Sequence, residues 1–341
     1  GAAAITSGVA CLLKQKYIDQ FKQSPSAALI KCILINSADD IDNPQVDYDS
    51  GFGSLNALEA IKTIDESRFL SGTIENQQEI RYPIDINANT KEFKASITWN
   101  DPPAALNTPQ ALINDLDIWL TDAQGNQTLP WVLNADPSAI TTLATRQRDH
   151  LNNVEQVSLD YPQAGRYYMH VKGTRVGIRE KPFYISHQTT AINQFQWNFP
   201  SQNDQLFADD YTYLRFKNTF NSTGHLSVSF DNGANWDLIT NNIANNTHFY
   251  KWKTPSLFTS ALLKMSIEGQ DFISAPFTIS RPVNFNVGYN CNKSILLHWP
   301  EQTESTSYTV YTITNNKLQP LTTTIDTLIQ IPKTSSSSNY F

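Results

Sequence analysis

Two groups of acidic and amide side chains have the clearest capacity for chemistry in this sequence. The first contains Asn114, Asp115 and Asp117, with Asp101 on a neighbouring expected loop. Alternate side chains of an extended segment point the same way, so Asp115 and Asp117 share one face. Calcium prefers carboxylate, amide and carbonyl oxygens, in sets of about 6–8. This group therefore predicts a calcium site, and Ca²⁺ is the cofactor that the sequence suggests.

A second group of the same residue types surrounds the next expected loop and strand: Asp136, Asp149, Asn152, Asn153 and Glu155. The alternative for both groups is structural, because Asp and Asn side chains commonly cap turns by accepting hydrogen bonds from nearby backbone N–H groups. A calcium ion that binds only the folded chain must raise its melting temperature, whereas turn caps predict no response to the metal.

Short strands must position both groups. From Phe69 onward the sequence shows period-2 alternation of apolar and polar residues, with turn-forming residues between the segments. The clearest strand segments are residues 93–99, 115–121, 154–159 and 165–171. No helical pattern interrupts them. Such an order predicts a β-sandwich or a jelly roll.

Residues 1–65 are the only part with a helical pattern. The first helix is expected to reach about Gln20, and no Ser, Thr, Asp or Asn precedes it as an N-cap. A second helix is predicted with Ser24 as its N-cap and Pro25 as its first residue. A turn through Gly51 and Gly53 leads into a third. The second helix has apolar residues at helical spacing: Ala28, Leu29, Cys32 and Ile33.

Three segments of this helical part resemble, in order, the end of the catalytic domain of the subtilases, the subtilisin-like serine peptidases. Residues 1–13 are similar to the helix that follows the catalytic serine, with Gly8 on the internal glycine of the family pattern. Residues 24–35 and 49–61 resemble the two segments that come next. Ala4 stands where the family has proline. The resemblance implies a nucleophilic serine immediately before the first residue, with the catalytic aspartate and histidine further upstream.

Peptidase chemistry of that kind needs a serine, a histidine, an aspartate and an oxyanion hole. The resemblance places all of them outside this chain, whose six histidines are scattered through the β segments. Neither G-x-S-x-G nor H-E-x-x-H occurs in the sequence. We therefore expect no catalytic residue and no peptidase activity in the chain alone. The longer protein would be a serine endopeptidase acting on proteins or peptides.

The β segments resemble further modules. Residues 67–188 are similar to the C-terminal β-barrel of some bacterial alkaline subtilases, where comparable segments contribute to calcium binding. Residues 189–280 are predicted to form a β-sandwich module, and Ser229 to Trp236 resembles an Asp-box, a hairpin motif. Residues 281–341 resemble the A, B and C strands of a fibronectin type III module and end where a further strand is expected.

The sequence thus predicts a mostly β, multidomain chain. Residues 1–66 are the helical remnant of a subtilase α/β domain, 67–188 the jelly roll, and 189–280 and 281–341 two β-sandwich-like modules. The net charge of −7 and a pI of about 5.4 argue against a nucleic-acid partner. No apolar run reaches the roughly 20 residues that span a bilayer. The three cysteines fit no zinc spacing, and Cys11 and Cys32 are expected to be buried in helices.

Two functions are consistent with these features. In the first, the chain is the C-terminal fragment of a secreted bacterial subtilisin-like serine endopeptidase, and its β domains stabilise the catalytic domain and act as spacer or adhesion modules. In the second, it is a non-catalytic surface adhesion or carbohydrate-binding β protein with a decayed peptidase segment. Trp119, Trp131 and Trp197 are the candidate exposed aromatics for carbohydrate. Either way the expected location is outside the cell or on its surface.

The helices of residues 1–65 raise a packing question. In a subtilase they would cover a parallel sheet, and here their apolar faces need another partner. The jelly roll, the other helices or a second copy of the chain could supply it. An exposed apolar surface of this size predicts self-association.

Overall fold

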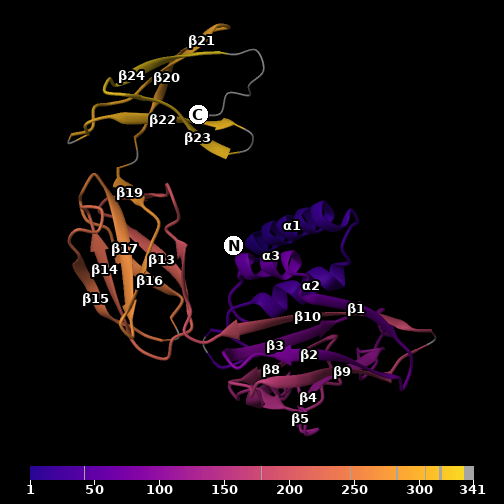
Figure 1. Ribbon diagram of the computed structural model, residues 1–341. Helices are drawn as coiled ribbons and strands as arrows, with labels where there is room; N and C mark the ends of the chain where they lie inside the picture. Colours follow the sequence, from indigo (N-terminus) through magenta and orange to yellow (C-terminus); the bar gives the residue numbers. More distant parts are fainter. Residues whose placement is uncertain are drawn as a thin grey trace. The chain divides into compact units, whose positions relative to one another are not determined.

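A computed structural model describes residues 1–41, 43–177, 179–245, 247–281, 283–303, 305–314 and 317–333 (Figure 1). The chain divides into two compact units, Gly1–Ile192 and Asn193–Phe341. The first unit opens with three helices, α1 (Ala2–Phe21), α2 (Ala27–Ser37) and α3 (Ala57–Asp65). Strands make up nearly all the remaining regular structure, so the prediction of a mostly β chain is confirmed. No described helix is long and apolar enough to cross a membrane.

Two four-stranded antiparallel sheets form the β part of the first unit. One sheet has the order β1 (Phe69–Ile74), β10 (Lys181–Ala191), β3 (Thr90–Thr98) and β8 (Val154–Asp160). The other has the order β2 (Glu79–Ile86), β9 (Gly165–Arg175), β4 (Asp115–Thr121) and β5 (Gln127–Thr128). The small hairpin of β6 (Trp131–Val132) and β7 (Thr145–Arg146) lies outside these two sheets. If the other eight strands are counted from 1 to 8 along the chain, the two sheets have the strand orders 1-8-3-6 and 2-7-4-5. This is the jelly-roll arrangement of two Greek keys.

The facing sides of the two sheets meet in one apolar core. Phe93, Ala95 and Ile97 of β3 are fully buried there, opposite Ile118 and Leu120 of β4. The alternation in β3 follows from the pleat, because every second side chain points to the same face. The core therefore uses the apolar half of each strand that the sequence pattern identified.

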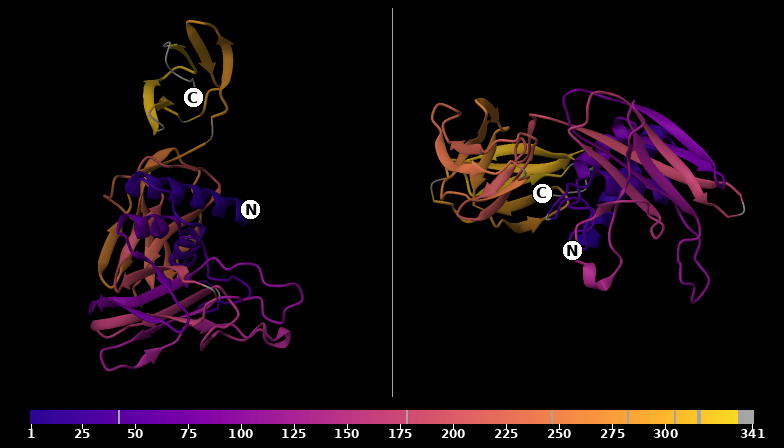
Figure 2. Two further views of the ribbon diagram at one scale, coloured as in Figure 1. Left: turned by 90° about the vertical axis from the view of Figure 1, so that its right-hand side faces the viewer. Right: turned by 90° about the horizontal axis from the view of Figure 1, so that it is seen from below.

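The outward face of β3 is also buried, although its side chains are polar. Lys94, Ser96 and Thr98 are 6%, 0% and 0% exposed. The helices lie over this sheet, with α2 against β10 and β3 (Figure 2). A period-2 strand would ordinarily turn such a face to solvent. In this protein the helices cover the polar face of β3.

Hydrogen bonds to α2 satisfy this polar face. The Thr98 hydroxyl donates to the Ala28 carbonyl at 2.7 Å, near the start of α2. The Lys94 ammonium donates to the Ala38 carbonyl at 2.9 Å, just past the end of the helix. Between them the Ser96 hydroxyl donates to the Asn36 side chain at 3.0 Å. Since an unpaired buried polar group costs about 1–3 kcal/mol, these bonds fix how α2 sits on the sheet.

Apolar residues complete the helical layer. They form one cluster of Val9, Leu13, Tyr17, Leu29, Ile33, Ala60 and Ile64, against which Phe69 and Tyr184 of the sheet pack. The helices therefore pack on one another and on the jelly roll. These are two of the three partners that the sequence suggested for their apolar faces. Cys32 is buried as predicted, but Cys11 is exposed. At about 100° per residue it lies far round α1 from the buried Val9 and Leu13.

The caps of α2 and α3 fit the sequence in part. Ser26, not Ser24, is the N-cap of α2, and its side chain accepts a hydrogen bond from Ala28 N. The backbone of Ser26 is extended, so the helix begins two residues later than predicted. The tight turn before α3 is confirmed. Gly53 has a φ of 105°, and a Cβ there would lie 2.1 Å from the Asp39 carbonyl oxygen.

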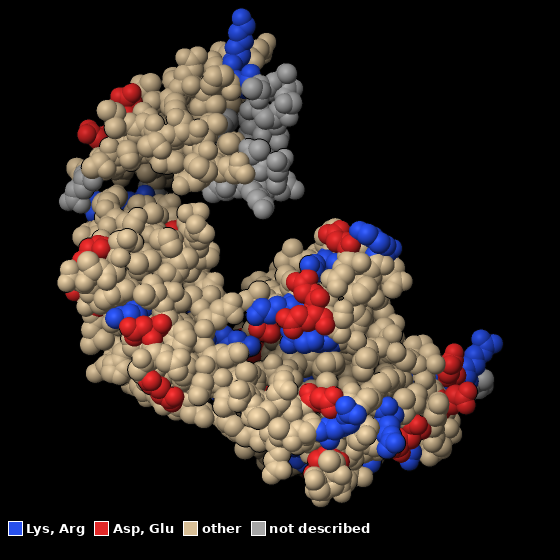
Figure 3. Space-filling view, viewed as in Figure 1, with Lys and Arg blue, Asp and Glu red and all other residues tan. Residues whose placement is uncertain are grey.

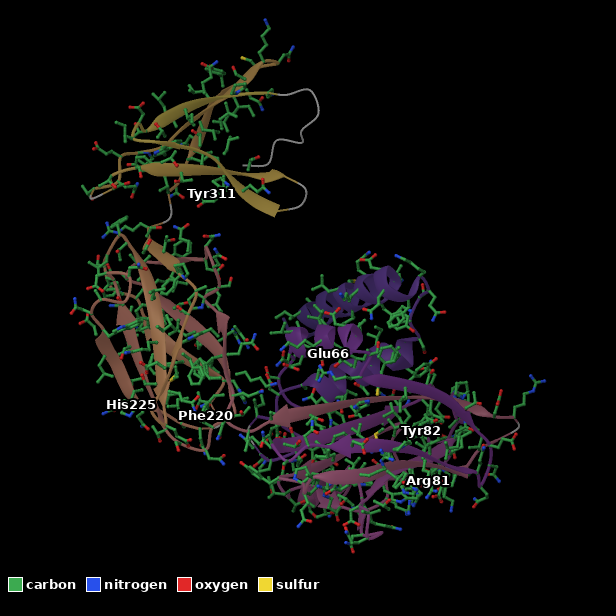
Figure 4. The ribbon with its side chains drawn as sticks, in the orientation of Figure 1. Glu66, Arg81, Tyr82, Phe220, His225 and Tyr311 are labelled. Carbon is green, nitrogen blue, oxygen red and sulfur yellow. The ribbon has the colours of Figure 1, made fainter. Side chains whose placement is uncertain are left out.

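The second unit begins with two sheets. The smaller contains β11 (Phe195–Phe199), β13 (Tyr211–Asn218) and β16 (Phe249–Lys253). The larger has β12 (Gln205–Phe207), β19 (Phe277–Ser280), β17 (Thr259–Ile267), β14 (Gly224–Ser229) and β15 (Asp237–Ile243), with β18 (Gln270–Ile273) on β17. One apolar core includes side chains from both sheets and the fully buried Phe220 from the loop between β13 and β14 (Figure 4).

The Asp-box segment forms the predicted hairpin, between the antiparallel strands β14 and β15. The Asp231 carboxylate accepts from the Asn235 backbone at 2.8 Å and from its side-chain amide at 2.7 Å. These hydrogen bonds hold the pKa of Asp231 at about 2. Trp236 packs beneath the ammonium group of Lys264, at 4.6 Å. All these contacts are structural.

The last strands of the chain are β20 (Asn286–Asn290), β21 (Ser294–His298), β22 (Tyr308–Thr314), β23 (Lys317–Thr324) and β24 (Leu328–Pro332). They enclose a small core of Ile295, Leu297, Trp299 and Ile331. The A, B and C strands of the fibronectin resemblance correspond to Pro282, residues 296–299 and residues 308–311. The last two segments overlap β21 and β22, and Pro282 lies outside the described residues. The three boundaries between the four domains drawn from the sequence stay predictions.

Candidate functional site

Four buried carboxylates gather at one place in the jelly roll. Asp115 and Asp117 come from β4, Glu155 from β8, and Asp149 from the loop before β8. Each is at most 4% exposed. Burial raises the pKa of Glu155 well above its ordinary value, and the negative charges of the other three raise it further. Burial likewise raises the pKa of Asp115.

Basic groups lie beside two of these carboxylates. His150 Nδ1 is 2.9 Å from Asp115 Oδ2. Arg148 Nη1 is 3.5 Å from Asp117 Oδ1, and its guanidinium stands 4.7 Å from the centre of the Trp119 ring. Arg148 contributes one full positive charge, and His150 contributes one only when it is protonated. Four carboxylates outnumber these groups, so the cluster carries excess negative charge unless it takes up protons or a cation.

Three oxygens of the cluster have no hydrogen-bond partner although they are buried: Asp115 Oδ1, Asp117 Oδ1 and Glu155 Oε1. Their sister oxygens are bonded, since Glu155 Oε2 accepts from Ile118 N at 2.8 Å and Asp117 Oδ2 accepts from the Thr174 hydroxyl. Buried carboxylate oxygens without partners are costly, and a hard cation is the ligand that would satisfy several at once.

The cluster is nevertheless not a preformed metal centre. Among the residues that the structure describes, no group of three or more His, Cys, Asp or Glu side chains is placed to hold one ion. A cation would have to draw the carboxylates together. The calcium prediction therefore stays a prediction, now concentrated on a smaller set of residues.

The other predicted ligands take structural roles. Asp101 accepts from the Ile113 backbone at 2.6 Å and from the Asn114 side-chain amide at 2.6 Å. Asp136 is the N-cap of the short 3₁₀ helix η1 (Pro137–Ala139). None of these hydrogen bonds involves a carboxylate of the buried cluster. Asp136 therefore caps a local turn, as the structural alternative expected, whereas Asp101 holds the segment before β4 through donors 12 and 13 residues further along the chain.

Two amides of the second group are also engaged. The Asn152 side chain donates to Asp149 Oδ2 at 2.7 Å. Asn153 accepts from the Lys31 ammonium at 2.9 Å and donates to the Trp99 carbonyl at 3.1 Å. Lys31 belongs to α2, so Asn153 ties the helical layer to the jelly roll. The structure does not gather all nine predicted ligands into one site.

A pocket of about 550 Å³ opens beside Asp101 and Asn114. Its charged lining has both signs, with Arg179 and Lys181 beside Asp101 and Glu180. The Lys181 ammonium is 3.9 Å from Asp101 Oδ1. Such a mixed lining selects no single charge of ligand, and none of the described lining residues is histidine, cysteine or serine.

Sequence reasoning missed one acid–histidine–hydroxyl row. His170 Nδ1 is 2.9 Å from Glu79 Oε1, and its Nε2 is 2.9 Å from the Thr121 hydroxyl. The ring stacks on Trp119 at 4.9 Å. The three residues lie on β2, β9 and β4, whose backbone N–H groups pair in the sheet ladder. An oxyanion hole needs free N–H groups, so this row reads as a cross-strand contact.

The tryptophans proposed for carbohydrate are not exposed. Trp119 is 4% exposed, beneath Arg148. Trp131 lies under the Arg146 guanidinium at 3.7 Å. Trp197 packs on the core of the second unit and donates to the Phe272 carbonyl at 2.9 Å. The three rings are therefore not the exposed aromatics that the sequence suggested, because Trp119 is buried and Trp131 and Trp197 are half-buried.

The helical layer has one open face. Of the 20 residues of α1, only Val9, Leu13 and Tyr17 are buried. Ile5 and Leu12 point outward, 63% and 55% exposed. Around α3 the surface is charged instead, with blue and red atoms side by side (Figure 3). Ion pairs account for this belt: Lys16–Asp65, Lys62–Glu59, Arg68–Glu59 and Arg68–Glu66.

Comparison with known proteins gives two partial matches in sequence. No family model matches the chain. The serine protease/ABC transporter B family protein tagA of Dictyostelium discoideum is 24% identical over 208 residues, 55% of this chain and 12% of that protein. The related tagB of the same organism is 28% identical over 109 residues, 32% of this chain and 6% of that protein. The chain thus spans about an eighth or less of either relative.

Solved structures share only the β character. The FN1–FN3 domains of chicken CNTN1 align with a TM-score of 0.20 at 11% identity, covering 73% of this chain and 86% of theirs. The adhesin domain of Epf from Streptococcus pyogenes aligns with a TM-score of 0.21 at 8% identity, covering 60% and 73%. Scores this low leave the function to be argued from the residues of this chain.

Proposed function

We propose that this chain is the C-terminal part of a subtilisin-like serine endopeptidase whose catalytic triad lies upstream. The open face of α1 carries the proposal. A 20-residue helix that buries only three residues, and presents Ile5 and Leu12 to solvent, lacks a partner for one side. In a subtilase the rest of the catalytic domain covers the helix after the serine. The two relatives named as serine proteases support a peptidase origin.

The jelly roll would stabilise that catalytic domain. Thr98 and Lys94 of β3 bond to the carbonyls of Ala28 and Ala38 at the two ends of α2. On this proposal, the last helices of the catalytic domain would rest on a sheet of the adjoining domain. The second unit would act as a spacer or adhesion module, on a protein exported to the surface or the medium. Its substrates would be proteins or peptides.

A peptidase assay tests the proposal. The full reading frame that contains this chain would be expressed and tested on a fluorogenic peptide panel, with a serine-directed inhibitor as control. Inhibitor-sensitive cleavage is expected. A longer protein that cleaves nothing would favour the adhesion alternative. If sedimentation shows dimers of the present chain that Leu12→Lys separates, a second copy covers α1, and the observation no longer supports a missing catalytic domain.

We further propose that the carboxylate cluster binds calcium. Asp115, Asp117 and Glu155 would supply the ligands, since each has a buried oxygen without a hydrogen-bond partner. A bound cation would neutralise their charge and tie β4 to β8. This would make the jelly roll more stable, as expected for a domain that supports a catalytic one outside the cell. Added calcium should then raise the melting temperature of the chain, and an unchanged melting temperature would contradict the proposal.

A further inference from the structure

The small sheet of the second unit carries an unusual outer face. Along β13, Tyr211, Tyr213 and Arg215 point away from the core, and each is exposed. Along β16, Phe249, Lys251 and Lys253 do the same. We call these six residues the aromatic–basic face. The alternate residues of both strands, including Leu214 and Trp252, point the other way and are buried in the core.

In the register of β13 and β16, each exposed pair combines an aromatic residue on one strand with a basic residue on the other. Tyr211 is paired with Lys253, Tyr213 with Lys251, and Arg215 with Phe249. Every rung therefore holds one aromatic ring beside one cation. Successive rungs on this face are about 6.8 Å apart, from two residues of antiparallel strand.

Contacts between the rungs hold the face together. The Lys251 ammonium lies 4.6 Å from the centre of the Tyr211 ring and 5.9 Å from that of Tyr213. The Tyr213 and Phe249 rings meet edge to face at 5.8 Å. Such contacts are weakly stabilising at exposed sites and hold the rings and cations in fixed positions relative to one another. The rings stay accessible, since Tyr211, Tyr213 and Phe249 are 59%, 46% and 51% exposed.

The positive charge of the face is not neutralised. In the described part of the chain no acidic side chain pairs with Arg215, Lys251 or Lys253. The nearest acids in sequence are Asp209 and Asp210, before β13, and Asp210 accepts a hydrogen bond from the Tyr211 backbone. Three unpaired cations stand out in a chain of net charge −7. Charge complementarity therefore selects an anionic partner.

We propose that the aromatic–basic face binds an acidic polysaccharide. The apolar C–H faces of sugar rings would stack on Tyr211, Tyr213 and Phe249, while carboxylate or sulfate groups pair with the cations. An aromatic ring next to a positive charge on every rung suits a polymer in which a sugar ring and an acidic group repeat together. Exposed aromatic patches of this kind commonly mark ligand-binding surfaces. The proposal does not depend on the peptidase origin.

Single-stranded nucleic acid is the main competitor, because it also offers rings and negative charge. Nucleic-acid binders combine stacking with a positively charged groove that follows the phosphates. This face lies on the outer side of a sheet, with one cation per rung. A flat face of this kind suits the stacking of sugar rings, and a direct comparison of acidic glycans with poly(dT) decides between the two partners.

Binding of defined polymers to the full chain tests the proposal. The probes are size-defined heparin and polygalacturonate, with neutral dextran and poly(dT) for comparison, each measured by calorimetry at physiological salt. Either acidic glycan is expected to bind, and dextran is not. The double variant Lys251→Gln/Lys253→Gln should weaken binding roughly tenfold, from two exposed ion pairs of up to about 1 kcal/mol each.

Replacing one aromatic ring distinguishes a binding site with specific contacts to the glycan from attraction by positive charge alone. Tyr213→Ala should weaken glycan binding about threefold to tenfold, as an aromatic contact of about 0.5–1.5 kcal/mol requires. Lys14→Gln on α1 and Leu238→Ala on β15, both exposed, should leave binding unchanged. The proposal is overturned if neither acidic glycan binds, if poly(dT) binds more tightly than both, or if Tyr213→Ala has no effect in a protein that circular dichroism shows to be folded.

Discussion

Leu13→Ala is the change that best tests whether the helical layer and the jelly roll unfold together. Leu13 is fully buried between α1 and the other helices, whereas its neighbour Leu12 is 55% exposed. The same substitution at the two positions therefore gives a matched pair. Leu12→Ala should change the unfolding free energy by no more than about 0.5 kcal/mol.

The cost of Leu13→Ala follows from its burial. Removing three carbon groups forfeits roughly 2.4 kcal/mol of transfer free energy, at about 0.8 kcal/mol each. The cavity left beside Tyr17 and Ile33 adds to this, so the total should be about 3–5 kcal/mol. Exchange of the most protected amides should then be faster by about a hundredfold or more, since 1.4 kcal/mol corresponds to a factor of ten.

Hydrogen exchange read by mass spectrometry measures this for each segment. Peptides from α2 and from β3 should lose the same protection, because Thr98 and Lys94 bind α2 to the sheet. Leu12→Ala should match the unaltered chain in both. If α2 peptides exchange faster while β3 peptides keep their protection, the helices and the jelly roll are separate units and the reasoning fails.

Three further outcomes are expected. Calcium at 100 times its Kd should stabilise the first unit by about 2.7 kcal/mol and raise its Tm by roughly 5–11 °C. Glu155→Gln should abolish this shift. In EDTA at pH 8 the variant should melt at a higher temperature than the unaltered chain, because burial raises the pKa of Glu155 and disfavours its charge. An unchanged Tm with calcium would refute the ion. Burial and the nearby Arg68 lower the pKa of His187 to about 4. The unfolded chain therefore binds a proton at this residue more readily than the folded chain. The unfolding free energy should fall by up to about 3 kcal/mol as the pH drops from about 6.5 to about 4. His187→Gln should remove that component in acid melts, and identical pH profiles would contradict it. The purified chain alone should cleave no peptide; turnover blocked by a serine-directed inhibitor would overturn that expectation.

Local signals in the sequence predicted local structure well. The alternation of residues 115–121 matches β4 to the residue. The Asp-box hairpin and the turn at Gly53 also formed as expected, because each depends on side chains and backbone within a few residues. Jelly-roll strands could be recognised for the same reason, through their period.

Contacts between distant segments could not be predicted in the same way. The polar side of β3 looks like a solvent face, and only the fold shows that α2 covers it. Asn153 resembles a calcium ligand until Lys31, 122 residues away in sequence, is seen to bind it. Likewise the aromatic–basic face depends on the register of Tyr213 with Lys251, although both strands show alternate ring and basic residues.

Covalent labelling of the longer protein with a fluorophosphonate tests the central claim most directly. Peptide mapping by mass spectrometry would locate the modified residue. A subtilisin-like origin predicts one labelled serine, directly preceding Gly1, and loss of the label when an upstream histidine is replaced. A protein that takes up no label, or takes it up at a serine within residues 1–341, would contradict the account.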